Sequence, residues 1–235
     1  MSGHSKWSSI KHQKASADAK RSNLFTKLAN AISVAARGGS DPSMNFSLRL
    51  AIDKARSANM PKDRIEKAIE RGSGAGGGAR VEEIIYEAYG PSGTAILIEV
   101  LTDNKNRASA EIKSVLNKFG GKLAAANAVQ YIFEKRGIIV VESENPDQTE
   151  EAIVESGAED YEKNDSLFTV FTKVENLSSV QDNLQKSGQK ITSSEIVLEP
   201  KTTIDLDEKE TEKAVKLLEA LDALDDVSSV SSNIG

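Results

Sequence analysis

Apolar residues in the first third of the chain recur every three or four positions, the spacing of a helix that buries one face. Three such stretches predict helices over about 23–37, 43–58 and 61–71. Asp41-Pro42 suits the start of the second helix, as an N-cap followed by proline at the first helical position. Gly72 is expected just past the end of the third helix. Short connections between these stretches predict a small three-helix bundle. The residues expected to face its core are Leu24, Phe25, Leu28, Ala31, Ile32, Ala35, Leu48, Ala51, Ile52, Ala55, Ile65, Ala68 and Ile69.

The helical pattern stops at a glycine-rich stretch, residues 72–78, with the sequence Gly-Ser-Gly-Ala-Gly-Gly-Gly. This composition is typical of a flexible linker. A phosphate-binding loop is the alternative, but such a loop follows a strand and ends in Gly-Lys-Ser/Thr, and neither feature is present. The linker is therefore the favoured interpretation.

Beyond the linker the apolar residues form short runs rich in Ile, Val and Tyr, which predict strands. Runs 81–89 and 94–102 flank Gly90-Pro91-Ser92-Gly93 and predict a hairpin. A helix over about 106–119 and a third strand over 129–133 follow. Residues 137–199 then predict the βαββαβ order of a ferredoxin-like unit. Its expected strands are 138–142, 159–161, 167–172 and 191–198, and its expected helices are 149–156 and 177–187.

The last predicted elements are a helix over about 207–224 and a strand over 227–234. The block after the linker lacks a second helix and a fourth strand, so we infer that this tail completes it. The expected fold is a multi-domain α and α+β protein: an N-terminal three-helix domain followed by two ferredoxin-like α/β domains, the last inserted into the middle one. The expected domains are residues 1–79, residues 80–136 plus 203–235, and residues 137–202.

Charge changes sign along the chain. The 235 residues carry a net charge of −6, yet residues 1–80 hold 15 basic and 6 acidic residues, while residues 137–235 hold 8 and 23. The segment between them is balanced. Such asymmetry indicates one end that attracts a polyanion and one end that phosphate would repel. A solvated charge pattern without a partner is the alternative, and for the acidic half it is the favoured one.

Composition excludes several classes of protein. There is no Cys, which excludes disulfide frameworks and thiolate metal sites. No apolar run approaches the ~18 residues of a membrane span. The basic start is Lys-rich rather than Arg-rich and lacks the apolar core of a secretory signal, so we expect a cytoplasmic protein.

Basic residues and rings are concentrated at the start of the chain. Lys and Arg attract phosphates, and bases stack on flat rings, so this arm is typical of nucleic-acid binding. Two alternatives stay open: the arm folds back on Glu66 or Glu70, or Trp7 packs in a core, as a lone Trp more often does. His4 and His12 have no ligand-spaced partners, so no metal site is predicted. The residues expected to bind nucleic acid are Lys6, Trp7, Lys11, His12, Lys14, Lys20, Arg21 and Lys27.

Two further basic sets are less specific. One alternates with acidic residues on the second and third predicted helices, which is typical of a solvated, salt-bridged face. The other is Lys105 and Arg107, at a predicted helix start whose backbone N–H groups could hold an anion. A plain cap by Asn104 or Asn106 is the equal alternative there. The first set consists of Lys54, Arg56, Lys62, Arg64, Lys67 and Arg71.

Catalysis finds little support in the chain. There is no Cys nucleophile and no Gly-x-Ser-x-Gly, and both His residues lie in the arm. The carboxylates occur in runs such as Glu82-Glu83 and Asp225-Asp226, which are typical of solvated faces. We therefore expect a non-enzymatic protein without a cofactor or a metal; an enzyme that works with carboxylates alone is the alternative.

Several motifs together resemble the YebC family, which includes bacterial regulators and the mitochondrial translational activator of cytochrome c oxidase. Four residues depart from the family pattern: Gln13, Ala88 and Ser92, and Tyr131 where Trp is typical. They concern the charge of the arm and the shape of one loop. The motifs are residues 3–12 (Gly-His-Ser-Lys-Trp-Ser-Ser-Ile-Lys-His), 18–21 (Asp-Ala-Lys-Arg), 38–42 (Gly-Gly-Ser-Asp-Pro), 59–61 (Asn-Met-Pro), 89–91 (Tyr-Gly-Pro), 102–107 (Thr-Asp-Asn-Lys-Asn-Arg) and 133–137 (Phe-Glu-Lys-Arg-Gly).

The resemblance implies a three-domain, cytoplasmic, non-enzymatic protein that acts in gene expression. It implies a DNA-binding transcriptional regulator, or a translation factor that binds ribosomal RNA or tRNA on the ribosome. The residues themselves do not choose between DNA and ribosomal RNA. A protein-interaction adaptor that binds its partner through the acidic domain is the third hypothesis.

Overall fold

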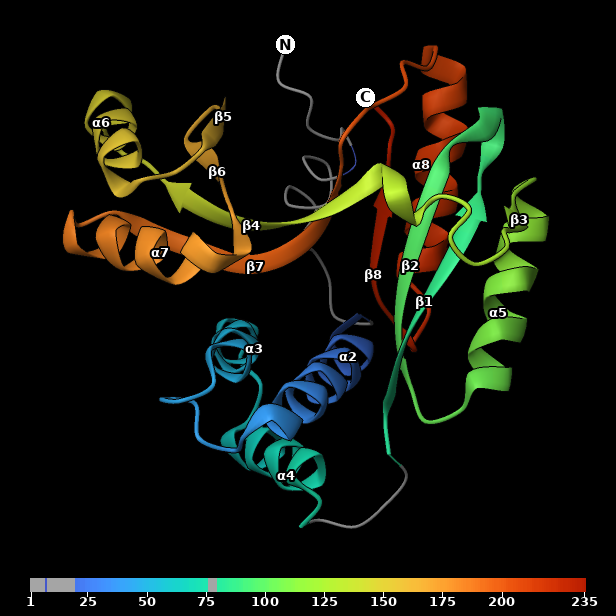
Figure 1. Cartoon of the computed structure of the whole chain (residues 1–235), viewed down its shortest axis with the longest axis horizontal. Helices are drawn as coiled ribbons and strands as arrows, with labels where there is room; N and C mark the ends of the chain where they lie inside the picture. Colours follow the sequence, from blue (N-terminus) through green and yellow to red (C-terminus); the bar gives the residue numbers. More distant parts are fainter. Residues whose placement is uncertain (1–6, 8–19, 76–79) are drawn as a thin grey trace. The chain divides into compact units, whose positions relative to one another are not determined.

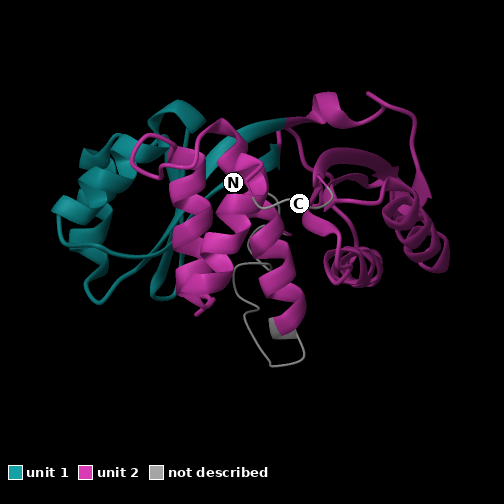
Figure 2. Ribbon diagram, turned by 90° about the horizontal axis from the view of Figure 1, so that it is seen from below, with its two compact units in different colours: residues 1–2, 134–199 teal, residues 3–133, 200–235 magenta. Residues whose placement is uncertain are grey.

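A computed structural model of the chain describes residues 7, 20–75 and 80–235 (Figure 1). The contacts divide the chain into two compact units (Figure 2). We call residues 3–133 with 200–235 the interrupted unit, and residues 134–199 the inserted unit. The inserted unit thus enters the sequence between two parts of the other. The division into three domains at the boundaries given above stays a prediction.

The N-terminal part of the interrupted unit holds the three predicted helices. They are α2 (Lys20–Ala35), which ends in a 3-10 turn (Ala36–Gly38), α3 (Phe46–Ser57) and α4 (Lys62–Ser73). Their inward faces form one apolar core, as the helical spacing predicts. The most deeply buried members of that core are Leu28, Ile32, Ala36, Leu48, Ile52, Ala55, Met60, Ile65 and Ala68.

Helix α3 begins later than predicted, because Asn45 and not Asp41 is its N-cap. The Asn45 side chain accepts the backbone N–H of Leu48 at 3.1 Å. The same side chain donates to the carbonyl oxygens of Ala35 and Gly39, each at 2.8 Å, which fixes it between two helices. Asp41 instead closes a turn, where its carboxylate accepts the backbone N–H of Ser43 at 2.9 Å.

Gly72 lies inside α4 and not beyond its end, because the helix continues to Ser73 and is capped by Gly74 at φ +85°. Its lack of a side chain lets α2 and α4 approach closely. A Cβ at position 72 would lie 2.2 Å from the carbonyl oxygen of Ser33 and 2.8 Å from the Cβ of Ala36. The Ser33 hydroxyl adds a hydrogen bond to the carbonyl of Ala68 at 2.8 Å.

We expect Gly72→Ala to lower the free energy of unfolding by about 1–3 kcal/mol, because backbone atoms of α2 would have to move away. This cost outweighs the ~1 kcal/mol that alanine gains over glycine inside a helix. Urea unfolding followed by far-ultraviolet circular dichroism measures the change. Ser73→Ala, at the exposed next position, is the matched control and should change stability little. A Gly72→Ala variant as stable as the wild type would contradict the close helix contact.

The rest of the interrupted unit is a four-stranded antiparallel sheet in the order β3-β1-β2-β8. The predicted hairpin is present, and its turn is a 3-10 helix over Pro91–Gly93. One face of the sheet packs on α5 and α8 through alternate residues such as Ile96 and Ile98. The elements are β1 (Glu82–Tyr89), β2 (Ala95–Thr102), α5 (Lys105–Lys118), β3 (Lys122–Leu123), α8 (Glu208–Asp222) and β8 (Val227–Ser232).

The strand predicted over 129–133 is wrong. Residues Gln130–Ile132 form a 3-10 helix, and Phe133 is the first residue of the long strand β4. The backbone N–H groups of Val129 and Gln130 are bound by the side chain of Glu87, at 2.7 and 2.9 Å, instead of by a neighbouring strand. Val129 and Phe133 are buried, which made the stretch resemble a strand. The two-residue strand β3 was not predicted.

The inserted unit has the predicted ferredoxin-like order, with a sheet arranged β5-β6-β4-β7. The side chain of Thr192 donates to the carbonyl of Val140 at 3.2 Å, and the backbone N–H of Lys201 donates to Ile132 at 2.8 Å. The last strand of the inserted unit therefore runs antiparallel to its first strand. The elements are β4 (Phe133–Glu142), α6 (Pro146–Ser156), β5 (Asp160–Asn164), β6 (Leu167–Thr172), a 3-10 turn (Val174–Asn176), α7 (Leu177–Lys186) and β7 (Lys190–Pro200).

Candidate nucleic-acid interface

Part of the predicted interface lies outside the described residues. Lys6, Lys11, His12 and Lys14 belong to that part of the arm, and so do residues 76–79 of the predicted linker. Lys20 and Arg21 are the first two residues of α2. Their role in nucleic-acid binding stays a prediction.

Trp7 is a core residue in this structure, the commoner of the two alternatives for a lone Trp. Its side chain is only 4% exposed and belongs to the apolar cluster beneath the sheet of the interrupted unit. The indole Nε1–H donates a hydrogen bond to the carbonyl of Val230, in the edge strand β8, at 2.8 Å. A buried ring that has found its polar partner is not available to a base, so stacking by Trp7 is corrected to packing.

Lys27 contacts the C-terminal end of α8. Its ammonium group donates to the carbonyl oxygen of Asp222, in the last turn of that helix. Beside it, the Asn23 side chain donates to the carbonyl of Ala223 at 3.0 Å and to the carboxylate of Asp225 at 2.6 Å. The last carbonyls of a helix have no partner within the helix and carry partial negative charge. Lys27 therefore already has an acceptor within the protein, for which a phosphate would have to compete.

At the start of α5, the two cations predicted to hold an anion pair with carboxylates of the protein itself. Asn104 is the N-cap, as one alternative proposed, and accepts the backbone N–H of Arg107 at 3.1 Å. The Arg107 guanidinium binds the carboxylate of Asp226 through Nε at 3.0 Å and Nη2 at 2.9 Å. Lys105 pairs with Glu82 at 2.7 Å. The hydrogen bond and charge of Asp226 raise the pKa of Arg107 above its ordinary value.

The helical bundle, residues 20–75, has an excess of basic residues, and most of them are exposed. Residues 20–75 hold 11 Lys and Arg against 5 Asp and Glu. As predicted, part of this charge is salt-bridged: Arg56 lies 3.7 Å from Asp53, and Lys62 lies 3.5 Å from Glu66. The excess remains at the surface. The exposed cations on α3, on α4 and at the end of α2 are Arg37, Arg49, Lys54, Arg56, Lys62, Arg64 and Lys67.

Arg71 differs from the other cations of the bundle because it faces α2. Its Nη2 donates to the Asn30 side chain at 2.7 Å, and its Nε donates to the Ser33 hydroxyl at 3.0 Å. Burial lowers the pKa of this guanidinium below its ordinary value, and the negative charge of Asp103 opposes that shift. Arg71 therefore ties α4 to α2 and does not add to the exposed basic face.

Tyr131 is a surface residue that the sequence reasoning missed as a candidate site. In a strand over 129–133 it would share a face with Val129 and Phe133, both of which are buried. The 3-10 helix turns it outward, and its side chain is 70% exposed. The predicted strand placed Tyr131 on the buried side, and no local signal in the sequence distinguishes it from its buried neighbours.

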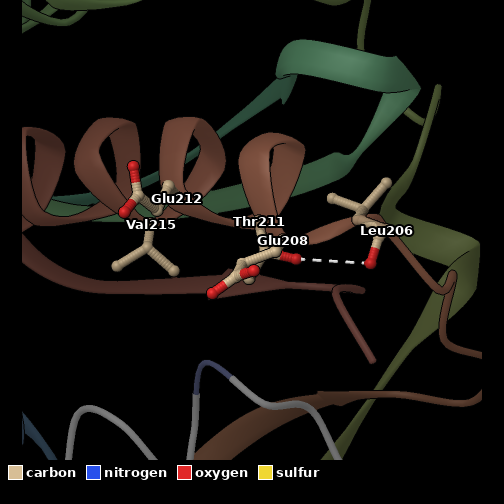
Figure 3. A pocket seen from close by; sticks show the side chains of 5 residues that line it. All are labelled: Leu206, Glu208, Thr211, Glu212 and Val215. Carbon is tan, nitrogen blue, oxygen red and sulfur yellow. Dashed lines mark hydrogen bonds between the residues drawn. The ribbon is translucent and has the colours of Figure 1, made fainter.

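A hollow beside the start of α8 does not suit a polyanion (Figure 3). Leu206 and Val215 give it an apolar wall, and the Thr211 hydroxyl donates to the carbonyl of Leu206 at 3.5 Å. Glu208 and Glu212 also line it, and their charge would repel phosphate.

The described part of the chain shows neither a metal-binding cluster nor a membrane-spanning helix. No group of three or more His, Cys, Asp or Glu side chains is placed there to hold a metal ion. Within the same ranges, no helix combines the length and the apolar character needed to cross a bilayer.

Comparisons with known proteins match the whole chain. Residues 5–75 match the family model described as the TACO1/YebC protein N-terminal domain, and residues 81–234 match the TACO1/YebC second and third domain. A relative from Thermoanaerobacter pseudethanolicus is 47% identical over 93% of this chain and 91% of its own. One from Treponema denticola is 48% identical over 100% and 96%. Both carry the name probable transcriptional regulatory protein.

A solved structure agrees with the fold over almost the whole length. The crystal structure of a conserved hypothetical protein from Aquifex aeolicus superposes with a TM-score of 0.90 at 42% sequence identity. The match covers 98% of this chain and 97% of the other.

Proposed function

Since the chain belongs to the TACO1/YebC family, we propose that it is a non-enzymatic, nucleic-acid-binding regulator of gene expression that acts in the cytoplasm. The names of its relatives as transcriptional regulatory proteins support a regulatory role. The physical chemistry of the chain supports nucleic acid as the partner.

The difference in charge between the helical bundle and the inserted unit is the observation that carries the proposal. The bundle has six more basic than acidic residues over 20–75, whereas the inserted unit holds 6 Lys and Arg against 15 Asp and Glu. Phosphates are attracted to the first surface and repelled from the second. The exposed cations of the bundle and the basic arm therefore form the binding end.

Contacts of this kind give affinity with little sequence specificity, because phosphates carry no sequence information. Recognition of nucleic-acid shape fits structured RNA at least as well as duplex DNA. The translation-factor hypothesis therefore accompanies the regulator hypothesis in the test that follows.

The test measures the affinity of the full chain for a labelled RNA hairpin and a labelled DNA duplex by fluorescence anisotropy. We expect affinity to fall steeply between about 50 and 200 mM salt, with each phosphate contact adding about 0.9 to the slope of the log–log plot. Lys54→Gln with Lys67→Gln, in the bundle, should weaken binding and reduce that slope. Affinity that stays constant as salt rises would contradict the proposal.

The matched control is Lys173→Gln with Lys186→Gln, which removes two exposed lysines from the acidic inserted unit. These changes should leave the affinity unaltered. The arm is tested separately with Lys11→Gln and Lys14→Gln. Deletion of residues 1–21 would not serve, because it also removes Trp7 from the core.

Sedimentation of a cell lysate, with and without nuclease, separates the two cellular roles. A transcriptional regulator should be found with chromosomal DNA, and a translation factor should migrate with ribosomes. If the chain does neither and keeps a protein partner after nuclease treatment, the adaptor hypothesis is correct instead.

A further inference from the structure

Tyr131 is the one aromatic residue among the large apolar side chains that are exposed in the described chain. Three other large apolar side chains of the described chain are well exposed, and they lie elsewhere: Leu24 on α2, Met44 before α3, and Val154 on α6. A protein interface needs a contiguous apolar surface with several such residues. A single exposed ring suits a flat ligand instead.

The loop that leads to Tyr131 is held in place by the side chain of Glu87. The Glu87 carboxylate accepts the backbone N–H groups of Asn127 at 2.5 Å, Val129 at 2.7 Å and Gln130 at 2.9 Å. Burial alone would raise the pKa of Glu87. The hydrogen bonds from these N–H groups and from that of Ala128 together outweigh burial, so the pKa lies below its ordinary value. The carboxylate is therefore charged at neutral pH and binds the loop strongly.

Further hydrogen bonds fix both sides of the ring's position. The backbone N–H of Ile132 donates to the carbonyl of Val129 at 3.0 Å, and that of Lys201 donates to Ile132 at 2.8 Å. The Tyr89 hydroxyl contacts the carbonyl of Ala128 at 3.5 Å. Tyr131 is thus presented by an ordered segment, and a ligand would not have to order it on binding.

A cation and an amide accompany the ring. Lys201 is exposed, and its ammonium group donates to the carbonyl oxygen of Tyr131 at 3.1 Å. Gln130, the residue before Tyr131, is also exposed. An aromatic ring, an ammonium group that bonds the backbone of the same residue, and the amide of the preceding residue therefore belong to one exposed segment.

These three groups match the three parts of an unpaired nucleotide. A base stacks on an aromatic face whatever its identity, and a side-chain amide can bond a base edge. A phosphate would compete with the Tyr131 carbonyl for the exposed ammonium group of Lys201. A base inside a duplex offers no face to a ring at the protein surface. The complementary ligand is therefore single-stranded.

We propose that Tyr131, Lys201 and Gln130 form a second nucleic-acid contact, which stacks on one unpaired base of a single strand. The site rests on the proposed function and deepens it, because it adds a single-stranded segment to the phosphate contacts of the bundle. Both RNA and DNA single strands supply the required chemistry.

The test compares the full chain with Tyr131→Ala on three labelled probes: a 12-nucleotide RNA strand, the corresponding DNA strand, and a blunt-ended RNA duplex without unpaired bases. We expect Tyr131→Ala to weaken single-strand binding about 10-fold, as the loss of one base–ring stack does, and to leave duplex binding unchanged. Tyr131→Phe keeps the ring and should bind as the wild type does. A loss on RNA, DNA or both supports the proposal and identifies the sugar that the site accepts.

Met44→Ala is the matched control, since it removes another well exposed apolar side chain, and it should change no affinity. Tyr131→Ala should also unfold at the wild-type urea concentration, because so exposed a ring contributes little to packing. Single-strand affinity unchanged by Tyr131→Ala would overturn the site alone, and so would an equal loss on the duplex. A wild-type chain that binds none of the probes at low salt would overturn the proposed function and this site together.

Discussion

Trp7→Ala is expected to lower the free energy of unfolding by about 3 kcal/mol or more, the usual cost of removing a buried Trp from a core. The ring is almost entirely buried in the apolar cluster that also contains Ile98 and Leu221. Truncation leaves a cavity there and removes the donor to the carbonyl of Val230. Urea unfolding followed by circular dichroism measures the loss.

Trp7→Phe separates the two contributions. It keeps most of the apolar volume and loses only the indole N–H, so it should cost about 1 kcal/mol beyond any change in packing. Trp7 is also the only Trp in the chain, which makes its fluorescence a direct report on its environment. Emission typical of a water-exposed indole, or strong quenching by acrylamide, would contradict its burial.

Arg107→Ala is expected to lower the free energy of unfolding by about 2 kcal/mol. Asp226 is the reason: its side chain is 8% exposed and would lose both hydrogen bonds of the guanidinium. An unpaired buried carboxylate costs about 3–5 kcal/mol. The expected value is lower because the Arg107 side chain is 48% exposed, so water can replace part of what is lost.

Lys105→Ala is the control for that substitution, since it lies in the same first turn of α5 and also pairs with a carboxylate. Both partners of the Lys105–Glu82 pair are about half exposed, so its loss should cost less than about 1 kcal/mol. If Lys105→Ala and Arg107→Ala were equally destabilising, the burial of Asp226 would not be the cause.

The helical spacing of apolar residues was sufficient to predict the bundle, because each of its helices buries one face against near neighbours. The βαββαβ order of the inserted unit was predictable for a similar reason: each element is bounded by turns that the sequence shows. The position of the α3 N-cap was not. Asp41 and Asn45 are both good caps, and hydrogen bonds from Asn45 to Ala35 and Gly39 decide between them.

The site residues were less predictable, because their partners lie far away in the sequence. Trp7 and Val230 are 223 positions apart, and Arg107 and Asp226 are 119 apart. Because the neighbouring residues in the sequence include no partner for these cations and this ring, sequence reasoning assigned them to a ligand. For Trp7, Lys27 and Arg107, the fold supplies a partner from α8, β8 or the turn between them. The cations of α3 and α4 were predicted to form a solvated, salt-bridged face, and their part in binding belongs to the proposed function.

The interrupted sheet sets an order on the assembly of the chain during synthesis. The inserted unit is one continuous stretch of 66 residues, so all its strands can pair as soon as Glu199 has been made. The hairpin β1–β2 can pair locally, but the sheet is completed only when β8 pairs with β2, and Trp7 also waits for Val230. Long-range pairing of this kind is slow and leaves apolar surface exposed meanwhile. Trp7 and β8 thus contribute to the same core from opposite ends of the sequence, and a chain cut short before Val227 would leave Trp7 without its hydrogen-bond partner.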